Sequence, residues 1–111
     1  MALAFKLKDY LLCVHRIDPL QGSELARALK GVAKGEERSR RLLEERFLRH
    51  VVAWVQPYRA QGLPFLGLIE SGNRALLKAI RNWKSEVGPF EDFAERMVSE
   101  EVEARLLARR A

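Results

Sequence analysis

The residue types that most often carry chemistry are sparse in this chain of 111 residues. Its one cysteine, Cys13, and its two histidines, His15 and His50, are the nitrogen and sulfur ligands available to a transition metal. Cys13 and His15 are two positions apart and His50 is distant, which matches no usual zinc spacing. We therefore expect no metal site. A single cysteine also excludes an internal disulfide, so the expected compartment is the reducing cytoplasm.

Sequence motifs of catalysis are missing as well. The chain contains no glycine-rich phosphate loop and no nucleophile elbow. Carboxylates gather between Glu86 and Glu103, where seven acids accompany one base, Arg96, for a local balance of −6. Such a helix could supply an acid–base pair, but acids along one exposed helical face are typical of a solvated surface. We expect neither an enzyme nor a bound cofactor.

The net charge of +5 is unevenly distributed. Residues 1–61 hold twelve Lys and Arg against seven Asp and Glu, whereas residues 62–111 hold eight of each kind. A basic excess favours nucleic acid or another polyanion as partner, and here that suggestion applies to the first half only. No apolar run approaches the roughly 18–20 residues of a membrane span, so we expect no membrane association.

Helical periodicity runs through the whole chain, and no strand pattern, repeat or low-complexity stretch interrupts it. We predict an all-α fold: a compact single domain over residues 1–111, built as a bundle of five or six helices. Helices are expected at 5–17, at 24–33 with Ser23 as N-cap, at 36–58 with its last turn distorted or ended by Pro57, in residues 59–83, and from Phe90 onward.

Residues 59–83 form the most informative stretch. Pro64 suits the first turn of a helix, where its missing N–H costs nothing. Farther on, Ser71-Gly72-Asn73 interrupts a helical apolar pattern. Gly72 can supply a left-handed turn, and Asn73 can cap the helix that follows. The pattern predicts two short helices that meet at a tight break, an arrangement typical of a docking element rather than a catalytic pocket.

The same stretch resembles the second conserved region of bacterial housekeeping-type sigma factors. In that family a Gly-Leu-x-Phe-Leu step leads into an Ile-x-x-Gly-Asn turn and a Leu-x-Lys-Ala-Ile helix. This chain carries Gly62-Leu63-Pro64-Phe65-Leu66, then Ile69 with Gly72-Asn73, then Leu77-Lys78-Ala79-Ile80. The resemblance extends upstream through Tyr58, Val51-Val52 and Leu25-Ala26-Arg27 to Asp9-Tyr10-Leu11, and so covers nearly the whole chain. It implies the helical fold of that region.

A protein partner follows from the resemblance. In the family this helix pair docks on the clamp coiled coil of the largest catalytic-side subunit of RNA polymerase core. Carried over by position, the docking surface comprises Leu66, Gly67, Glu70, Ser71, Asn73 and Leu77. Gly67, Glu70 and Ser71 stand where the family has Asp, Gln and Glu, so the charge pattern of the docking surface is altered.

The next helix corresponds to the one with which the family melts and reads the promoter's minus-ten element. The matching positions here are Phe90, Phe93, Arg96, Met97 and Glu100. Arg96 and Met97 replace two tryptophans that support a flipped base, and Glu100 replaces a base-reading Gln. Phe93 keeps a ring that can stack on an unpaired base. Because acids repel the phosphate backbone, we expect only weak binding of promoter DNA and no promoter melting.

Three hypotheses remain open. The first is a sigma-like protein that docks on RNA polymerase core, or on another protein, without full promoter recognition. The second is a minimal module that binds single-stranded minus-ten DNA. The third is a repurposed helical scaffold, such as a homo-oligomer that buries the Leu66–Leu77 surface. With 111 residues, we expect no room for the later sigma regions that read the upstream promoter element.

Overall fold

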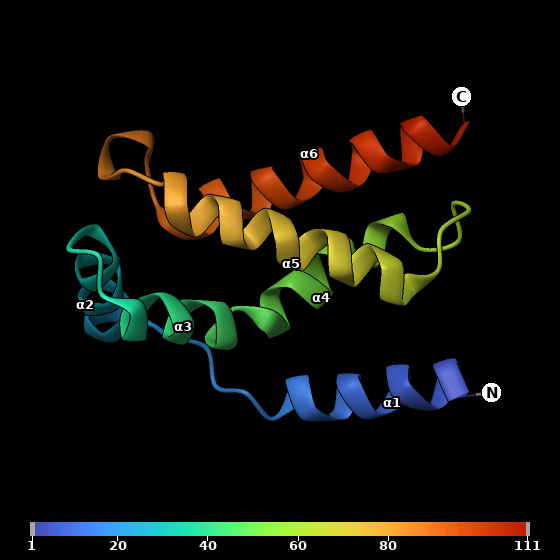
Figure 1. Ribbon diagram of the computed structural model, residues 1–111, viewed down its shortest axis with the longest axis horizontal. Coiled ribbons are helices and arrows are strands. Elements are labelled where there is room, and N and C mark those ends of the chain that lie inside the picture. The colour runs from blue at the N-terminus through green and yellow to red at the C-terminus, as the bar shows by residue number, and fades with distance from the viewer. Residues whose placement is uncertain (1, 111) are drawn as a thin grey trace.

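Two long antiparallel helices, α5 and α6, form the most extensive helix pair of the molecule. The computed structural model describes the backbone of residues 2–110 and the side chains of residues 7–109. Within it, α5 (Phe65–Asn82) and α6 (Phe90–Arg110) lie side by side and run in opposite directions (Figure 1). They are the longest helices, yet no helix in residues 2–110 is both long and apolar enough to cross a membrane.

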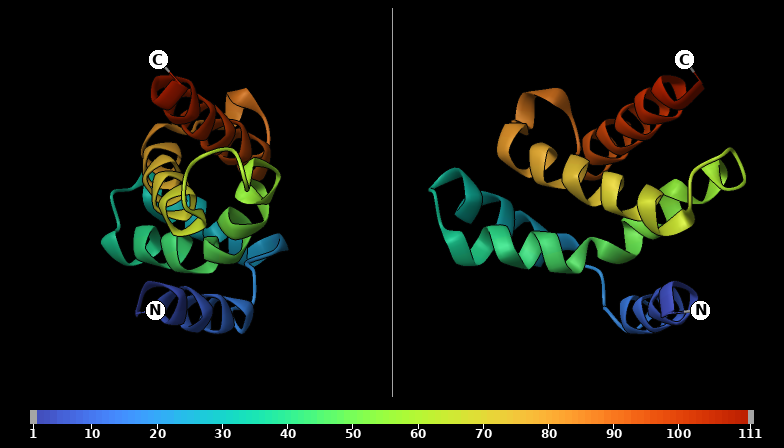
Figure 2. Two further views of the ribbon diagram at one scale, coloured as in Figure 1. Left: turned by 90° about the vertical axis from the view of Figure 1, so that its right-hand side faces the viewer. Right: turned by 45° about the vertical axis from the view of Figure 1, so that its right-hand side comes forward.

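Shorter elements surround this pair. They are α1 (Ala2–His15), α2 (Gly22–Ala33), α3 (Glu37–Arg46), α4 (Leu48–Val55) and the 3₁₀ turns η1 (Gln56–Tyr58) and η2 (Ser85–Val87). α4 packs against both α5 and α6, α2 packs on α3, and α1 forms the outermost layer next to α4 (Figures 1 and 2). Residues 2–110 contain six α-helices and no strand, so the predicted all-α bundle is confirmed.

One hydrophobic core holds the elements together. Leu43, Phe47 and Val51 are buried on the α3–α4 side, as are Val98 and Val102 on α6. The chain leaves α2 at Gly35 (φ +80°) and enters α6 after Gly88 (φ +104°), two backbone conformations that favour glycine.

The helix predicted over 36–58 is two helices. Phe47, between α3 and α4, has φ −97° and ψ 1°, and the chain changes direction there (Figure 1). The N–H of Val51 still donates to the carbonyl of Phe47 at 3.1 Å, as the N–H of Phe47 does to that of Leu43. Because these i to i−4 bonds survive, the apolar spacing continues through the bend, and periodicity alone cannot reveal it.

Of two predictions about helix ends, the one for Pro57 is confirmed and the one for Ser23 is wrong. Pro57 lies in η1, after α4 has ended at Val55, which confirms that the last turn is distorted. The prediction of Ser23 as the N-cap of α2 is wrong, because Gln21 takes that position and Ser23 lies within the first turn. The extended backbone of Gln21 (φ −140°, ψ 157°) already sets the helix start.

The predicted break at Ser71-Gly72-Asn73 is also wrong, because α5 continues through all three residues. Glycine suits position 72 because a side chain would not fit there, and not because the backbone makes a left-handed turn. A Cβ atom at Gly72 would lie 2.6 Å from Cγ1 of Val51, 3.2 Å from Cγ1 of Val55 and 3.4 Å from Cγ1 of Val98. Gly72 therefore lets α5 approach α4 and α6 closely, and this packing outweighs the low helix propensity of glycine.

Replacing Gly72 by Ala should destabilise the fold by about 1–3 kcal/mol, because the new methyl group overpacks a closed interface. Urea denaturation measures this directly. Gly67→Ala is the matched control, since the nearest atom to a Cβ there is Cδ of Pro64 at 3.9 Å. That variant should gain about 0.5–1 kcal/mol from helix propensity. Equal stability of the two variants would contradict the packing role of Gly72.

Candidate docking surface and nucleic-acid interface

The outer face of α5 carries most of the predicted docking residues. Leu66, Glu70, Asn73 and Leu77 follow one another at intervals of four, three and four residues, so they form one row along the helix. Glu70 is exposed, while the other three and the adjoining Gly67 are partly exposed. We call these five residues the α5 stripe. The structure thus brings five of the six predicted docking residues together on one accessible face.

Ser71 is the sixth predicted docking residue, and it does not belong to this face. Its side chain is completely buried, and its Oγ accepts a hydrogen bond of 3.5 Å from the guanidinium of Arg74. Ser71 follows Glu70 by about 100° of helical rotation, which turns it toward the packed side of α5. Its assignment as a contact residue is therefore corrected.

The beginning of α5 is anchored by two contacts around the preceding loop and by the backbone conformation of Pro64. The guanidinium carbon of Arg59 lies 4.5 Å from the ring centroid of Phe65, and Pro64 adopts the extended backbone (φ −60°, ψ 145°) that precedes the first turn. Tyr58 Oη donates a hydrogen bond of 2.7 Å to Oε2 of Glu103 on α6. These contacts hold the loop 59–64 against the bundle and so fix the end of the α5 stripe near Leu66.

Helix α1 borders the α5 stripe at Asn73. Nδ2 of Asn73 donates a hydrogen bond of 3.3 Å to Oη of Tyr10, and the Asn73 side chain therefore contacts α1 instead of capping a helix as predicted. Oδ1 of Asn73 is buried and has no hydrogen-bond partner among the described residues. Leu7, Tyr10 and Leu11 pack against the core beside it. Asn73 consequently joins the stripe to the outermost helix.

On α6, the predicted DNA-contacting residues divide between surface and core. Arg96 and Glu100 are exposed, whereas Phe93 and Met97 are partly exposed. The guanidinium carbon of Arg96 lies 5.6 Å from the ring centroid of Phe93, a cation–π geometry. These four residues form an accessible surface from which a ring could stack on a base.

Phe90 belongs to the core instead, and its prediction as a DNA contact is corrected. Only 2% of its surface is exposed. Its ring stands edge-on to Phe47, with centroids 5.1 Å apart, and edge-on to Trp83 at 5.9 Å. Edge-to-face pairs of this kind add stability beyond area burial. The aromatic pattern of the sequence could not separate Phe90 from Phe93, because both lie on the apolar side of the helix.

Acidic side chains surround the accessible part of α6. Asp92, Glu95 and Glu100 are exposed. Two other acids contact side chains of neighbouring helices: Oε1 of Glu91 lies 3.0 Å from Nε2 of His50, and Oε1 of Glu101 lies 3.2 Å from Nζ of Lys78. A nucleic-acid strand that lay along the first half of α6 would therefore meet more carboxylates than cations.

Cys13, His15 and His50 have separate environments. Cys13 and His15 are exposed on α1. His50 on α4 stacks on Phe47 with ring centroids 4.5 Å apart. In the described part of the chain, no three His, Cys, Asp or Glu side chains group in a way that could hold a metal ion.

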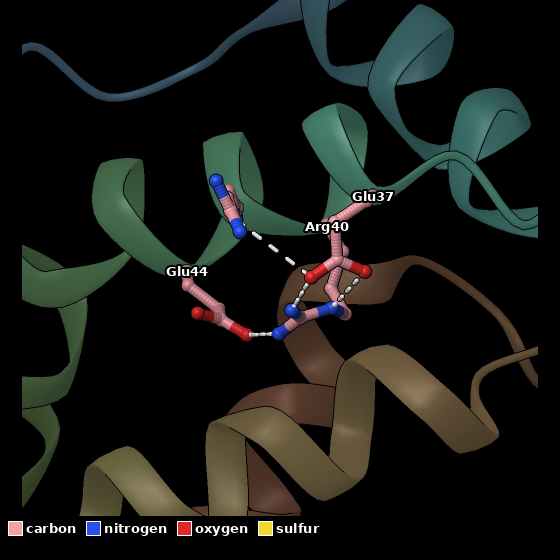
Figure 3. A network of polar contacts seen from close by, with 4 residues as sticks. Glu37, Arg40 and Glu44 are labelled. Carbon is pink, nitrogen blue, oxygen red and sulfur yellow. Dashed lines mark hydrogen bonds and ion pairs between the residues drawn. The ribbon is translucent and has the colours of Figure 1, made fainter.

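One polar network on α3 is not predicted from the sequence. Arg40 forms ion pairs with both Glu37 and Glu44, and Nε of Arg41 lies 3.7 Å from Oε1 of Glu37 (Figure 3). The hydrogen bond from Arg40 lowers the pKa of Glu37, and the same bond raises the pKa of Arg40. The spacing Glu-x-x-Arg-x-x-x-Glu is the signal that could have indicated it. The network neutralises part of the basic excess in the first half of the chain.

Sequence comparison relates the chain to proteins of bacterial transcription. The chain is 32% identical over 82 residues to the RNA polymerase sigma factor SigA of a Bacillus species, an alignment that covers 74% of this chain and 22% of that protein. It is 34% identical over 89 residues to the RNA polymerase sigma factor RpoS of Coxiella burnetii, covering 79% of this chain and 25% of that protein. No protein-family model matches the chain. The chain thus spans at most a quarter of the length of these two curated relatives.

The contact between Tyr58 and Glu103 gives a pH-dependent prediction. Burial, followed by the hydrogen bond to Glu103, raises the pKa of Tyr58 above its ordinary value of 10.0. Because the folded state favours the neutral phenol, this contribution to stability is present below pH 10 and is lost as the pH rises through the raised pKa.

In a Tyr10→Phe variant, Tyr58 is the only tyrosine, so the ultraviolet absorbance of phenolate reports its titration alone. We expect a midpoint above 10 in the folded protein and a lower midpoint in urea. The additional change Glu103→Gln should lower the folded midpoint, since it removes the acceptor charge. A folded midpoint equal to the unfolded one would contradict the contact.

Proposed function

The chain is a relative of bacterial RNA polymerase sigma factors, and from this premise we propose that it docks on RNA polymerase core through the α5 stripe without full promoter recognition. Its role is transcription-related and sigma-like. The relatives are named as sigma factors of RNA polymerase, which supports core polymerase as the partner. The resemblance of residues 59–83 to the second sigma region supports the clamp coiled coil as the site on that partner.

The observation that carries the proposal is the form of the α5 stripe. Leu66 and Leu77 place an apolar side chain at each end, while Glu70 and Asn73 place polar groups between them. Eleven residues of helix separate the leucines by about 16 Å, a suitable length for lying along a partner helix. Recognition of this kind uses a few apolar anchors at helical spacing, with polar groups that fix the register.

The contacts that hold α5 in place also suit docking. Its inner face packs on α4 and α6 at Gly72, and its beginning is held by the Tyr58–Glu103 and Arg59–Phe65 contacts. A stripe on such a rigid helix loses little conformational entropy on binding. Glu70 adds a negative charge to the α5 stripe, whereas the family has a neutral Gln at this position. The charge of the stripe therefore differs from that of the family's docking surface.

Promoter reading receives less support from α6. Phe90 is in the core, and the accessible Phe93 shares its side of α6 with Glu100, while Asp92 and Glu95 are exposed elsewhere on the same helix. Each of these acids repels the phosphate backbone and so weakens nucleic-acid binding. We therefore propose that the protein engages polymerase through protein contacts and that α6 contributes little to binding DNA.

A second candidate function is a minimal module for single-stranded minus-ten DNA. The geometry of Phe93 favours it, because the partly exposed ring has the Arg96 guanidinium 5.6 Å from its centroid. An aromatic ring with an adjacent cation can stack a base and meet its phosphate. Experiments can separate the two functions, because docking would use α5 and DNA binding would use α6.

Leu77→Asp should weaken retention on immobilised, purified core polymerase by about tenfold or more, since it places a charge in the apolar end of the α5 stripe. Leu107→Asp is the matched control: it makes the same change at an exposed position near the end of α6 (67% exposed). Circular dichroism verifies that both variants are folded. Equal retention of the two variants would refute docking through the stripe.

Light scattering of the free protein tests self-association. A dimer that Leu77→Asp dissociates would show that the stripe binds a second copy, and would favour the scaffold hypothesis over polymerase docking.

Reversing the charge of two exposed acids on α6 should strengthen the weak DNA binding expected of the natural protein. We expect Glu95→Lys with Glu100→Lys to raise the affinity for a fluorescent single-stranded minus-ten oligonucleotide by about tenfold at low salt, with a steeper salt dependence. Fluorescence anisotropy at two salt concentrations measures both quantities. Glu24→Lys with Glu45→Lys, on α2 and α3, makes the same change in net charge as a control.

Saturable binding by the natural protein would contradict the proposed absence of promoter reading. If Phe93→Ala then removed that binding, the result would establish the second candidate function.

A further inference from the structure

A second surface, separate from the α5 stripe, lies between α2 and the connection from α5 to α6. Figure 2 shows both segments at the same end of the molecule. Two adjoining hollows share Ala26, Leu29 and Trp83. The larger one has a volume of about 730 Å³ and extends to Val32 and Ile80. We call this surface, defined by these five residues with Lys30, Arg81 and Lys84, the α2 groove.

The α2 groove exists because α2 packs mainly on α3. Ala28 and Gly31 are buried on that side, and a Cβ at Gly31 would lie 2.0 Å from Oγ of Ser39, so the two helices are closely apposed. On the other side, Leu29 and Val32 remain only partly buried. An apolar helical face that is open along its length is typical of an interaction site.

Trp83 forms a fixed floor for the groove. Nε1 of Trp83 donates a hydrogen bond of 2.9 Å to the carbonyl of Gly88, and its ring stands edge-on to Phe90. The side chain nevertheless stays partly exposed. A rigid aromatic ring held at a surface in this way is a common anchor of protein interfaces.

The rim of the groove is basic at one end. Lys30, Arg81 and Lys84 are exposed there, and Glu86 is the one acid among the residues that line this hollow. Within the described side chains, none of the three cations has an ion pair within 4.0 Å. The other hollow contains Glu91 and no Lys or Arg. The cations therefore mark the end of the groove near Lys84.

We propose that the α2 groove binds an amphipathic helix of a partner protein, with acidic residues at one end of that helix. Its apolar side chains would cover Leu29 and Trp83, and its acids would meet Lys30, Arg81 and Lys84. α2 has twelve residues and a length of about 18 Å, which accommodates about three turns of the partner. Complementary charge fixes the direction in which that helix lies.

A helix fits this surface better than single-stranded nucleic acid. A nucleic-acid strand carries a phosphate at every nucleotide, so it would place negative charge beside Glu86 and Glu91 as well as beside the cations. A peptide can carry its acids at one end alone. The proposal is independent of polymerase docking, because the α2 groove and the α5 stripe share no residue.

A pair of synthetic peptides tests the proposal. The first is an amphipathic helix of about sixteen residues with leucines at positions i, i+3, i+4 and i+7 and glutamates at one end. The second replaces its glutamates with lysines. In a Trp54→Phe protein, Trp83 is the only tryptophan and reports binding by fluorescence. We expect saturable binding of the acidic peptide in the micromolar range, at least about tenfold tighter than that of the basic peptide.

Protein variants then locate the site. Lys30→Glu with Lys84→Glu should reverse the preference between the two peptides. Lys8→Glu with Arg49→Glu, on α1 and α4, makes the same change in net charge away from the groove and should leave the preference unchanged. Leu77→Asp should bind the acidic peptide as the natural protein does, so a failure of polymerase docking would not affect this result.

Three outcomes would overturn the proposal. The first is no saturable change in Trp83 fluorescence with folded protein. The second is equal affinity for the two peptides. The third is displacement of the acidic peptide by a single-stranded oligonucleotide at lower concentration, which would make the groove a nucleic-acid site.

Discussion

The close approach of three helices at Gly72 is the constraint on which the rest of the structure depends. Val51 and Val55 of α4 and Val98 of α6 occupy the space that a side chain at this position would need. Because the interior of a protein is close-packed, even one methyl group here would separate the helices. Gly72 thereby sets the position of α5, and α5 in turn sets which of its residues face outward.

The continuity of α5 changes how its outer face can act. A break at Ser71-Gly72-Asn73 would place Leu66 and Leu77 on two short helices at an angle to each other. One uninterrupted helix aligns them in a straight row, with Glu70 and Asn73 between. The proposed docking would therefore require a partner with a linear surface, such as a coiled coil. The buried Ser71 makes no part of that surface, whatever residue the sigma relatives carry at this position.

Helix α6 shows how one segment can retain a fold while its outer chemistry differs. Its inner face, with Phe90, Val98 and Val102, belongs to the core. Its outer face carries acids, with Phe93 and Arg96 among them. Packing constrains the first set, because these residues are buried in the core. The exposed acids of the outer face have no such constraint, and their negative charge opposes nucleic acid while leaving the fold intact.

The sequence by itself determined the features that depend on local pattern. Apolar spacing predicted the all-α class, and Pro57 predicted the distorted last turn of the helix that contains it, because proline cannot continue a regular helix. Tertiary structure decided the rest. It kept Gly72 helical, bent the chain at Phe47, buried Ser71 and Phe90, and left the α2 groove open. These outcomes depend on the space that residues distant in sequence leave at one point, which no local spacing can report.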